Sequence, residues 1–423
     1  MKTLRNKKLG TTRAKKPLYA GLPLIVSFMG VWSPTALGQL TCNITQITDG
    51  NTFGAIIQRN NTAINADGTR IAFHLTANLT GGNPDLNHEI FLFDSNTNTI
   101  TQITNTTSGA APTNHAPSLN TDGTLIAFES TADLTGQNPE LNREIFLSDA
   151  VSGTFRQLTE NAGVGQAYLP SINGDGTQIA FESNANPTGQ NSNGNSEIDL
   201  VDTVSNSIDQ ITNSPARAGS FNASISANGT RIAFESDENL TGRNPDFSRE
   251  IFLFDTATNT TTQLTNSTGT GDGGGSFAPS INANGTRIAF HSNRNLTGSN
   301  ADGNDEIFLV DTTAGTVTQI TNTAGGDPLL ENYSASINAD GTRIAFVSGR
   351  DLSGSNSDSS LEIVLFDTTS STFTQVTNAA AGSSASPSIN SDGTRIAFVS
   401  RSDLTGGNSD NFDEVFLASC EEP

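Results

Sequence analysis

The stretch "INADGTRIAF", from Ile64 to Phe73, recurs along the whole chain with small changes. Near-copies begin at Leu119, Ile172, Ile225, Ile281, Ile337 and Ile389, so the chain contains the stretch seven times. A sequence that repeats at a nearly fixed period encodes a series of similar structural units that pack on one another. The period therefore decides the fold class.

The spacing inside each repeat is constant over most of its length. From the turn glycine to the threonine of the next Gln-Ile-Thr, Gln-Leu-Thr or Gln-Val-Thr is always 36 residues, as from Gly68 to Thr104. From that threonine to the next turn glycine the distance varies between 16 and 20 residues. Insertions are therefore confined to one connection per repeat.

Each repeat carries four strand signals and no helical period. A short strand such as "PSIN" precedes the Asp-Gly-Thr or Asn-Gly-Thr turn, and "IAF", "EIFLFD" and "TTTQLT" follow it. Asp or Asn before Gly supplies the positive φ that a tight hairpin requires. We therefore predict an all-β chain, a seven-bladed β-propeller with four-stranded antiparallel blades.

The two ends of the chain predict how the ring closes. The seventh copy stops after Glu414–Leu417 without a fourth strand, while "NITQIT" at Asn43–Thr48 reads as a fourth strand with no blade before it. The N-terminal strand should therefore complete the last blade and remove two free edges.

The two cysteines favour the same closure. In repeat register, Cys420 and Cys42 match Ser95 and Asn98, the ends of a four-residue turn whose Cα atoms lie within about 7 Å, close enough for a disulfide. We predict that Cys42 and Cys420 are bonded. The alternative is a lipid on Cys42, although Gln39-Leu40-Thr41 lacks the small residues expected before such a cysteine.

Residues 1–38 differ in composition from the rest. They hold seven Lys or Arg and no acid, with an apolar run of 15 residues from Leu18 to Trp32. We expect a signal peptide over 1–38, because a membrane anchor, the alternative, needs about 20 apolar residues. The mature propeller would span 39–423, periplasmic or secreted, without a transmembrane segment and monomeric. Loss of the seven basic residues takes the formal charge from −22 to −29, which excludes nucleic acid as a partner.

Repeat five, "INANGTRIAFHS" followed by "DGNDEIFLVD" and "TVTQITN", resembles the WD-like β-propeller repeat of TolB-type proteins. The resemblance covers residues 43–420. It implies an exported propeller that binds other macromolecules of the cell envelope. TolB places an α/β domain before a six-bladed propeller, whereas here no such domain is expected before Asn43 and there are seven repeats.

A polar loop between the second and third strands recurs in every repeat, as in "NLTGGNPDLNHEI". Side-chain oxygens at alternate positions of a Gly-containing loop are typical of calcium sites, so calcium is the one cofactor expected. The candidate ligands are Asn83, Asp85, Asn87, Glu89, Asp246, Glu250, Asn300, Asp302, Asn304, Glu306, Asp358, Glu362, Asp410 and Glu414. The alternative is that Asn and Asp bond their own backbone while Glu caps the next strand, which needs no ion.

The four histidines give weaker signals. His74 and His291 follow "IAF" at the same repeat position, but we expect them on nearly opposite sides of the ring, unable to share an ion. His88 and His115 are expected in loops without a partner. No nucleophile elbow or Gly-rich phosphate loop is present, so no catalytic residue is predicted.

The variable connections should lie on the same face as the polar loops, and binding residues are drawn disproportionately from such loops. Tyr168, Phe221, Phe277, Leu330 and Tyr333 are the candidate partner-binding residues. The sequence thus favours an exported, non-catalytic scaffold that binds a protein or glycan of the cell envelope or outside the cell. The alternatives are an exported hydrolase or lyase acting on polysaccharide, and a calcium-stabilised structural propeller.

Overall fold

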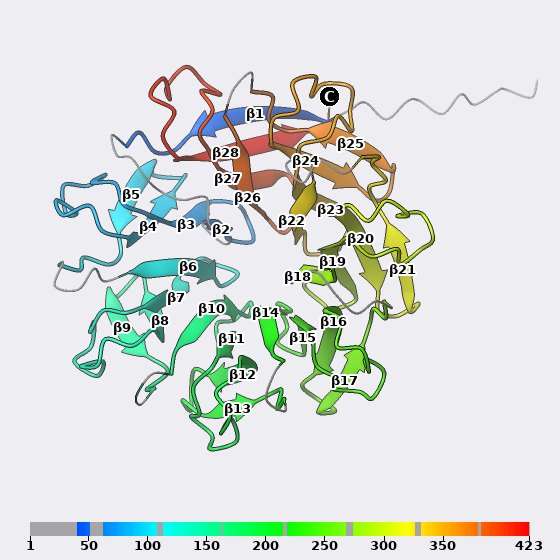
Figure 1. The fold of residues 1–423 in the computed structure, drawn as a ribbon. Helices are drawn as coiled ribbons and strands as arrows, with labels where there is room; N and C mark the ends of the chain where they lie inside the picture. Colours follow the sequence, from blue (N-terminus) through cyan, green and yellow to red (C-terminus); the bar gives the residue numbers. More distant parts are fainter. Residues whose placement is uncertain are drawn as a thin grey trace, which may run out of the picture. The chain divides into compact units, whose positions relative to one another are not determined.

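The computed structural model describes residues 40–50, 62–107, 113–161, 163, 165–214, 218–267, 274–325, 331–379 and 382–422. Gly38–Pro423 form one compact unit. The described residues contain 28 strands and no helix, and so no helix that could cross a membrane. The strands form seven four-stranded antiparallel sheets arranged around a centre (Figure 1). The predicted seven-bladed propeller is confirmed, whereas the predicted signal peptide lies outside the described residues.

Six blades each take four consecutive strands, numbered in chain order from the innermost outward. Blade 1 contains β2 (Thr62–Ile64), β3 (Arg70–Leu75), β4 (Glu89–Asp94) and β5 (Thr99–Gln102). Blade 2 contains β6 (Asn114–Leu119), β7 (Leu125–Ser130), β8 (Glu144–Asp149) and β9 (Thr154–Gln157). Blade 3 contains β10 (Ala167–Ile172), β11 (Gln178–Ser183), β12 (Glu197–Asp202) and β13 (Ile208–Gln210).

Blade 4 contains β14 (Ser220–Ile225), β15 (Arg231–Ser236), β16 (Glu250–Asp255) and β17 (Thr260–Gln263). Blade 5 contains β18 (Ser276–Ile281), β19 (Arg287–Ser292), β20 (Glu306–Asp311) and β21 (Thr316–Gln319). Blade 6 contains β22 (Asn332–Ile337), β23 (Arg343–Ser348), β24 (Glu362–Asp367) and β25 (Thr372–Gln375). Blade 7 contains β26 (Ser384–Ile389), β27 (Arg395–Ser400), β28 (Glu414–Glu421) and, from the other end of the chain, β1 (Thr41–Gln46).

The seventh blade closes the ring as the sequence predicts. β1 pairs antiparallel with β28, and the two strands from opposite ends of the chain lie side by side (Figure 1). Cys42 lies directly opposite Cys420 in this ladder, and a disulfide joins them across a Cα–Cα distance of 4.0 Å. The bond takes the place of the turn that joins the third and fourth strands of the other blades.

The Asp-Gly-Thr turn of the repeated stretch is held by its own side chains. In the first copy the Asp67 carboxylate accepts hydrogen bonds from the backbone N–H of Thr69 at 2.9 Å and from its hydroxyl at 2.6 Å. The Thr69 hydroxyl is the main cause of a lowered Asp67 pKa. Gly68 has φ +74°, a conformation that glycine adopts without steric cost. These local interactions form the hairpin from β2 to β3.

In five of the seven blades an arginine follows this turn and links the blade to the next, whereas blades 2 and 3 carry Leu125 and Gln178 there. Arg70 donates a hydrogen bond to the carbonyl oxygen of Gly123, in the corresponding turn of blade 2, at 3.2 Å. The same bond is formed by Arg231 to Gly285, Arg287 to Gly341, Arg343 to Gly393 and Arg395 to Gly68. We call the side of the ring that carries these turns the turn face.

The "IAF" residues form the cores between blades. Ile71, Ala72 and Phe73 have no exposed surface. Phe73 packs with Phe91 of its own sheet and with residues of blade 7, whereas Ala72, on the opposite side of the strand, packs with residues of blade 2. Because one sheet cannot cover both of its own faces, each copy depends on its two neighbours, which is why the stretch is repeated around a closed ring.

Candidate functional site

The polar loops between the second and third strands lie against the variable connections between blades. The side-chain amide of Asn87 donates to the carbonyl oxygen of Thr106 at 2.7 Å, and Asn142 does the same to Asn161 at 2.7 Å. The sequence-based prediction that both kinds of segment share one side of the ring therefore agrees with the contacts. We call this side the loop face.

The glutamate of each polar loop has a clear structural role. Glu89 accepts a hydrogen bond from the hydroxyl of Thr104, and a second from the backbone N–H of Thr106 at 2.6 Å. The threonine is the one in the Gln-Ile-Thr motif, so the two recurring motifs bind each other. The same hydroxyl-to-carboxylate bond joins Thr159 to Glu144, Thr212 to Glu197, Thr265 to Glu250, Thr377 to Glu362 and Thr48 to Glu414. Burial raises the pKa of Glu144 to about 6 and of Glu414 to about 7.

The asparagines of these loops use their amide N–H groups and leave several oxygens unpaired. Asn83 donates to the carbonyl oxygens of Ala77 and Asn87 at 3.3 and 2.9 Å. The buried Oδ1 atoms of Asn83, Asn87, Asn300 and Asn304 have no hydrogen-bond partner within the described structure. Buried oxygens of this kind are satisfied by water or by a cation, so calcium binding stays a prediction.

The acidic candidates of these loops are separated by burial. The loop glutamates are buried, whereas Asp85, Asp302, Asp358 and Asp410 are exposed and Asp246 is half-buried. Over the described parts of the chain, no three of these carboxylates come close enough together to form a metal-binding group. Any calcium ion would therefore depend on asparagine and backbone oxygens as well.

Three positions meet at several places where two blades adjoin at the loop face. They are the residue after "IAF", the residue before the loop glutamate, and the second residue of the next blade's innermost strand. Between blades 2 and 3 these are Glu129, Arg143 and Tyr168. Arg143 forms an ion pair with Glu129 and lies 5.4 Å from the centre of the Tyr168 ring. We call each such group a junction.

The other junctions carry different side chains. Between blades 4 and 5, Arg249 pairs with Glu235 at 3.1 Å and lies 4.3 Å from the Phe221 ring and 5.9 Å from the Phe277 ring. Between blades 3 and 4, Glu182 accepts from the Ser196 hydroxyl at 3.0 Å, and burial raises its pKa to about 7. The junctions thus differ in charge and polarity.

The aromatic residues predicted as partner anchors lie inside the propeller and not in the connections. Tyr168, Phe221, Phe277 and Tyr333 are each the second residue of an innermost strand, and all four are half-buried. They lie there because the innermost strands begin earlier than the "PSIN" pattern suggests. Leu330 lies outside the described residues. Partner binding by these residues stays a prediction.

The histidine expectations are corrected by the structure. His115 is the second residue of β6, not a loop residue, and His88 forms a β-bridge with Thr113 immediately before β4. Both contact His74 on β3: the ring centres of His74 and His115 are 4.8 Å apart, and those of His88 and His115 are 4.4 Å apart. The three residues form the junction between blades 1 and 2. Sequence reasoning missed them because no motif spans two blades.

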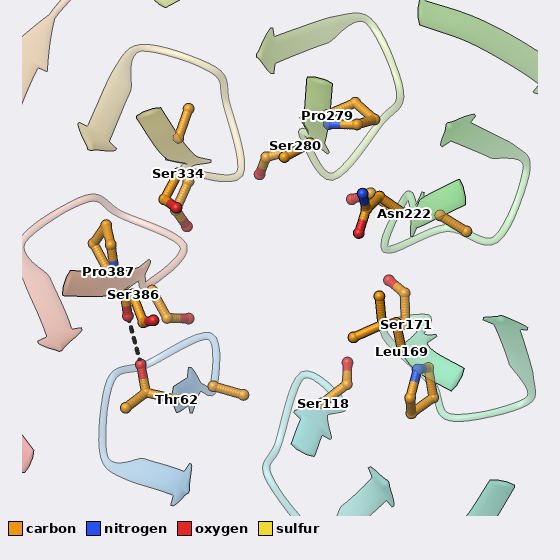
Figure 2. A pocket seen from close by; sticks show the side chains of 18 of the residues that line it. Thr62, Ser118, Leu169, Ser171, Asn222, Pro279, Ser280, Ser334, Ser386 and Pro387 are labelled. Atoms are coloured by element: carbon orange, nitrogen blue, oxygen red, sulfur yellow. Dashed lines mark hydrogen bonds between the residues drawn. The ribbon is translucent and has the colours of Figure 1, made fainter. Parts of the chain in front are cut away.

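The centre of the ring contains a cavity of about 250 Å³ lined by the innermost strands (Figure 2). A serine in six of these strands accepts a hydrogen bond from the backbone N–H of the next blade, as Ser118 does from Ile172 at 3.1 Å. The other bonds run from Ile225 to Ser171, Ile281 to Ser224, Ile337 to Ser280, Ile389 to Ser336 and Ile64 to Ser388. The cavity is smaller than the roughly 300–1,000 Å³ of typical ligand pockets, and its polar groups hold the blades together.

Three exposed apolar residues of the loop face were not predicted. Leu86, Leu141 and Phe247 are 44%, 47% and 56% exposed and have φ between 55° and 57°. At the same repeat position, also with positive φ, the other blades carry Gly194, Gly303, Ser359 and Asn411. When the repeats are aligned, this position otherwise holds Gly, Ser or Asn. An apolar residue there is the sequence signal that could have identified these three residues.

Comparison with known proteins places the fold. No protein-family model matches the sequence, and no curated protein matches it. The oligogalacturonate lyase of Vibrio parahaemolyticus is 12% identical, with a TM-score of 0.61 over 90% of this chain and 97% of that chain. An oligogalacturonate lyase in complex with manganese is 15% identical, with a TM-score of 0.57 over 91% and 97%. At such identities the likeness shows the propeller fold alone.

The chain is also similar to TolB from Acinetobacter baumannii, with 18% identity and a TM-score of 0.46. The similarity covers 76% of this chain and 66% of the TolB chain, slightly under two thirds of its length. The chain is thus a seven-bladed propeller by its own strand topology.

Proposed function

We propose that this chain is an exported, non-catalytic scaffold that binds a protein of the cell envelope or the extracellular space through its loop face. The observation that carries the proposal is the exposure of Leu86, Leu141 and Phe247 on that face. A bulky residue with positive φ costs about 1–2 kcal/mol relative to glycine. These side chains are too exposed to recover that energy by packing within the fold, so contact with a partner accounts for them best.

The chemistry of these residues favours a protein partner over a glycan. Two of the three are aliphatic and the third is aromatic, and such apolar side chains suit contact with a protein. The half-buried aromatic residues Tyr168, Phe221, Phe277 and Tyr333 lie beneath the same face and would support it. The Cys42–Cys420 disulfide favours an oxidising compartment, in agreement with export.

The test compares two faces of the same ring. The variant L86N/L141N/F247N removes the loop-face side chains and keeps residues that tolerate positive φ. V151T/V204T is the matched control, because Val151 and Val204 are 75% and 79% exposed in turns of the opposite face. A partner captured near one-to-one from envelope or secreted fractions should be lost with the first variant and kept with the second. Equal capture by both variants would contradict the proposal.

The absence of catalysis is part of the proposal and needs its own measurement. Oligogalacturonate lyases share this fold, so oligogalacturonate and other polysaccharides are the substrates to test first. No new reducing ends are expected. Turnover abolished by E182Q would favour the polysaccharide-cleaving alternative, because a buried carboxylic acid with a pKa of about 7 suits acid–base work.

A calcium-stabilised structural propeller is the second candidate. The unpaired Oδ1 atoms of Asn300 and Asn304 favour it, since both belong to the loop that also carries Asp302 and Glu306. Sites of extracellular type bind calcium with dissociation constants of about 10⁻⁴–10⁻³ M. At about 10 mM calcium one such site would stabilise the fold by about 1.4–2.7 kcal/mol. The melting temperature with calcium and then with chelator, for wild type and D302N, measures this.

A further inference from the structure

We propose that His74, His88 and His115 form a binding site for a divalent transition-metal ion, zinc before others, that joins blade 1 to blade 2. The site is independent of the proposed binding function. One ligand nitrogen from each of the three imidazoles lies within 4.8 Å of the other two. Among the described residues, no other group of three His, Cys, Asp or Glu side chains meets this closely.

The distances are close to those of a metal site. Nitrogen ligands at about 2.0–2.1 Å from a tetrahedral zinc ion are about 3.4 Å from one another. The three nitrogens would therefore need to approach one another by at most about 1.4 Å on binding the ion. Three histidines leave the fourth position of a tetrahedral ion to water. Water would reach that position past His88, which is half-buried.

The ring nitrogens are available for such an ion. Nδ1 of all three residues is buried and has no hydrogen-bond partner in the described structure. A buried polar atom without a partner costs about 1–3 kcal/mol, and here three of them belong to rings that contact one another. A bound metal ion would satisfy several of these atoms at once.

The protonation state of the histidines also fits. Burial lowers the pKa of each imidazole, that of His115 to about 3, so the rings are neutral at physiological pH. Neutral imidazole is the form that binds metal. Arg143, the nearest cation acting on His115, is already paired with Glu129. The formal charge of −22 on the whole chain further favours a cation.

The other junctions indicate why a metal ion at this one would stabilise the fold. At the junctions of blades 2 and 3 and of blades 4 and 5, the first blade carries an Arg–Glu ion pair at these positions, and its arginine lies against an aromatic ring of the next blade. At the junction of blades 1 and 2 neutral imidazoles replace these charges and cannot form an ion pair. A metal ion bound by all three imidazoles would link the two blades there.

The experiment measures zinc retained by the purified protein after stripping with chelator, equilibration with zinc and removal of excess metal. One zinc per chain is expected. H88A alters the most exposed ligand, and H291Q is the matched control, because His291 has the same repeat position as His74 but lies in another junction. Loss of a ligand should weaken binding by more than the 10–100-fold that follows loss of a supporting partner.

A second readout is the visible absorption of a bound cobalt ion. Cobalt in place of zinc should give the strong visible absorption of a tetrahedral site, and this absorption should disappear in H88A and remain in H291Q. Failure of the wild type to retain zinc or cobalt would overturn the proposal and leave the cluster as aromatic packing only. Equal metal retention by wild type and H88A, or equal loss in H88A and H291Q, would overturn it as well.

Discussion

The turn face of this propeller repeats one kind of contact between blades, whereas the contacts on the loop face differ between junctions. On the turn face one arrangement repeats in five of the seven blades, in which an arginine of one blade binds the turn glycine of the next. On the loop face the junctions differ, with an imidazole cluster at one, ion pairs at two others and an unpaired glutamate between these two. The repeated contacts hold the ring closed, and the side chains that differ between junctions provide its chemical groups.

The largest expected effect concerns the one place where the turn face is closed covalently. The variant C42S/C420S should lower the free energy of unfolding by about 2–5 kcal/mol, because the disulfide closes a loop with a sequence separation of 378 residues. Denaturant unfolding of the oxidised wild type and the variant measures the difference. A change within about 0.5 kcal/mol would mean that β1–β28 pairing alone closes the ring.

Glycines with positive φ on the two faces should respond differently to alanine. Gly285 has φ +74°, and a Cβ there would lie 2.6 Å from Cδ and 2.9 Å from Cβ of Arg231. Gly242 on the loop face has φ +79° and nothing within 4 Å of such a Cβ. G285A should cost about 2–4 kcal/mol and G242A about 1–2 kcal/mol, since only the first adds overpacking to backbone strain. Equal losses of unfolding free energy in the two variants, measured by thermal or denaturant unfolding, would mean that the turn face accommodates the added methyl group at little cost.

Glu182, which forms no ion pair with a described residue, should make the loop face sensitive to pH. Because the pKa of Glu182 is raised to about 7 in the fold, from 4.5, its contribution is fully present below about pH 4.5 and is lost as pH rises through 7. E182Q should therefore gain stability over wild type between pH 5 and 8, by about 1–2 kcal/mol after allowance for partial exposure.

E235Q is the matched control for the pH experiment, because Glu235 has the same repeat position as Glu182 but pairs with Arg249. It should lose stability at every pH, since it removes the closer of the two carboxylates that pair with Arg249, Asp237 being the other. Unfolding curves at pH 5, 6, 7 and 8 distinguish the two behaviours. A pH-independent difference between E182Q and wild type would show that Glu182 titrates normally.

The smallest expected effect comes from the exposed loop-face leucines. L141N should raise the free energy of unfolding by about 0.5–1 kcal/mol, because asparagine accepts positive φ more readily than leucine. V151T on the turn face should change it by less than about 0.5 kcal/mol. A loss of more than about 1 kcal/mol in L141N would show that Leu141 packs within the fold, and would weaken its assignment as a partner anchor.

The sequence by itself determined the architecture. The constant spacing from Gly68 to Thr104 and its repeats, the Asp-Gly-Thr turns and the position of Asn43–Thr48 predicted seven blades and the closing strand, and the register of Cys42 and Cys420 predicted the disulfide. These features depend on turn chemistry and strand alternation over a few residues. The sequence contains the turn and strand patterns in seven copies.

Only the tertiary structure decided which side chains meet between blades. His74, His88 and His115 are brought together by two neighbouring sheets, and Tyr168 meets Arg143 in the same way. The repeat indicates equivalent positions but not the distance across a junction, which depends on how one blade packs against the next. Exposure likewise requires the packed ring, so the sequence could not show that Leu86, Leu141 and Phe247 reach solvent while Tyr168 and Phe277 lie half-buried. Local chemistry therefore fixed the blades, and packing between blades produced the candidate sites.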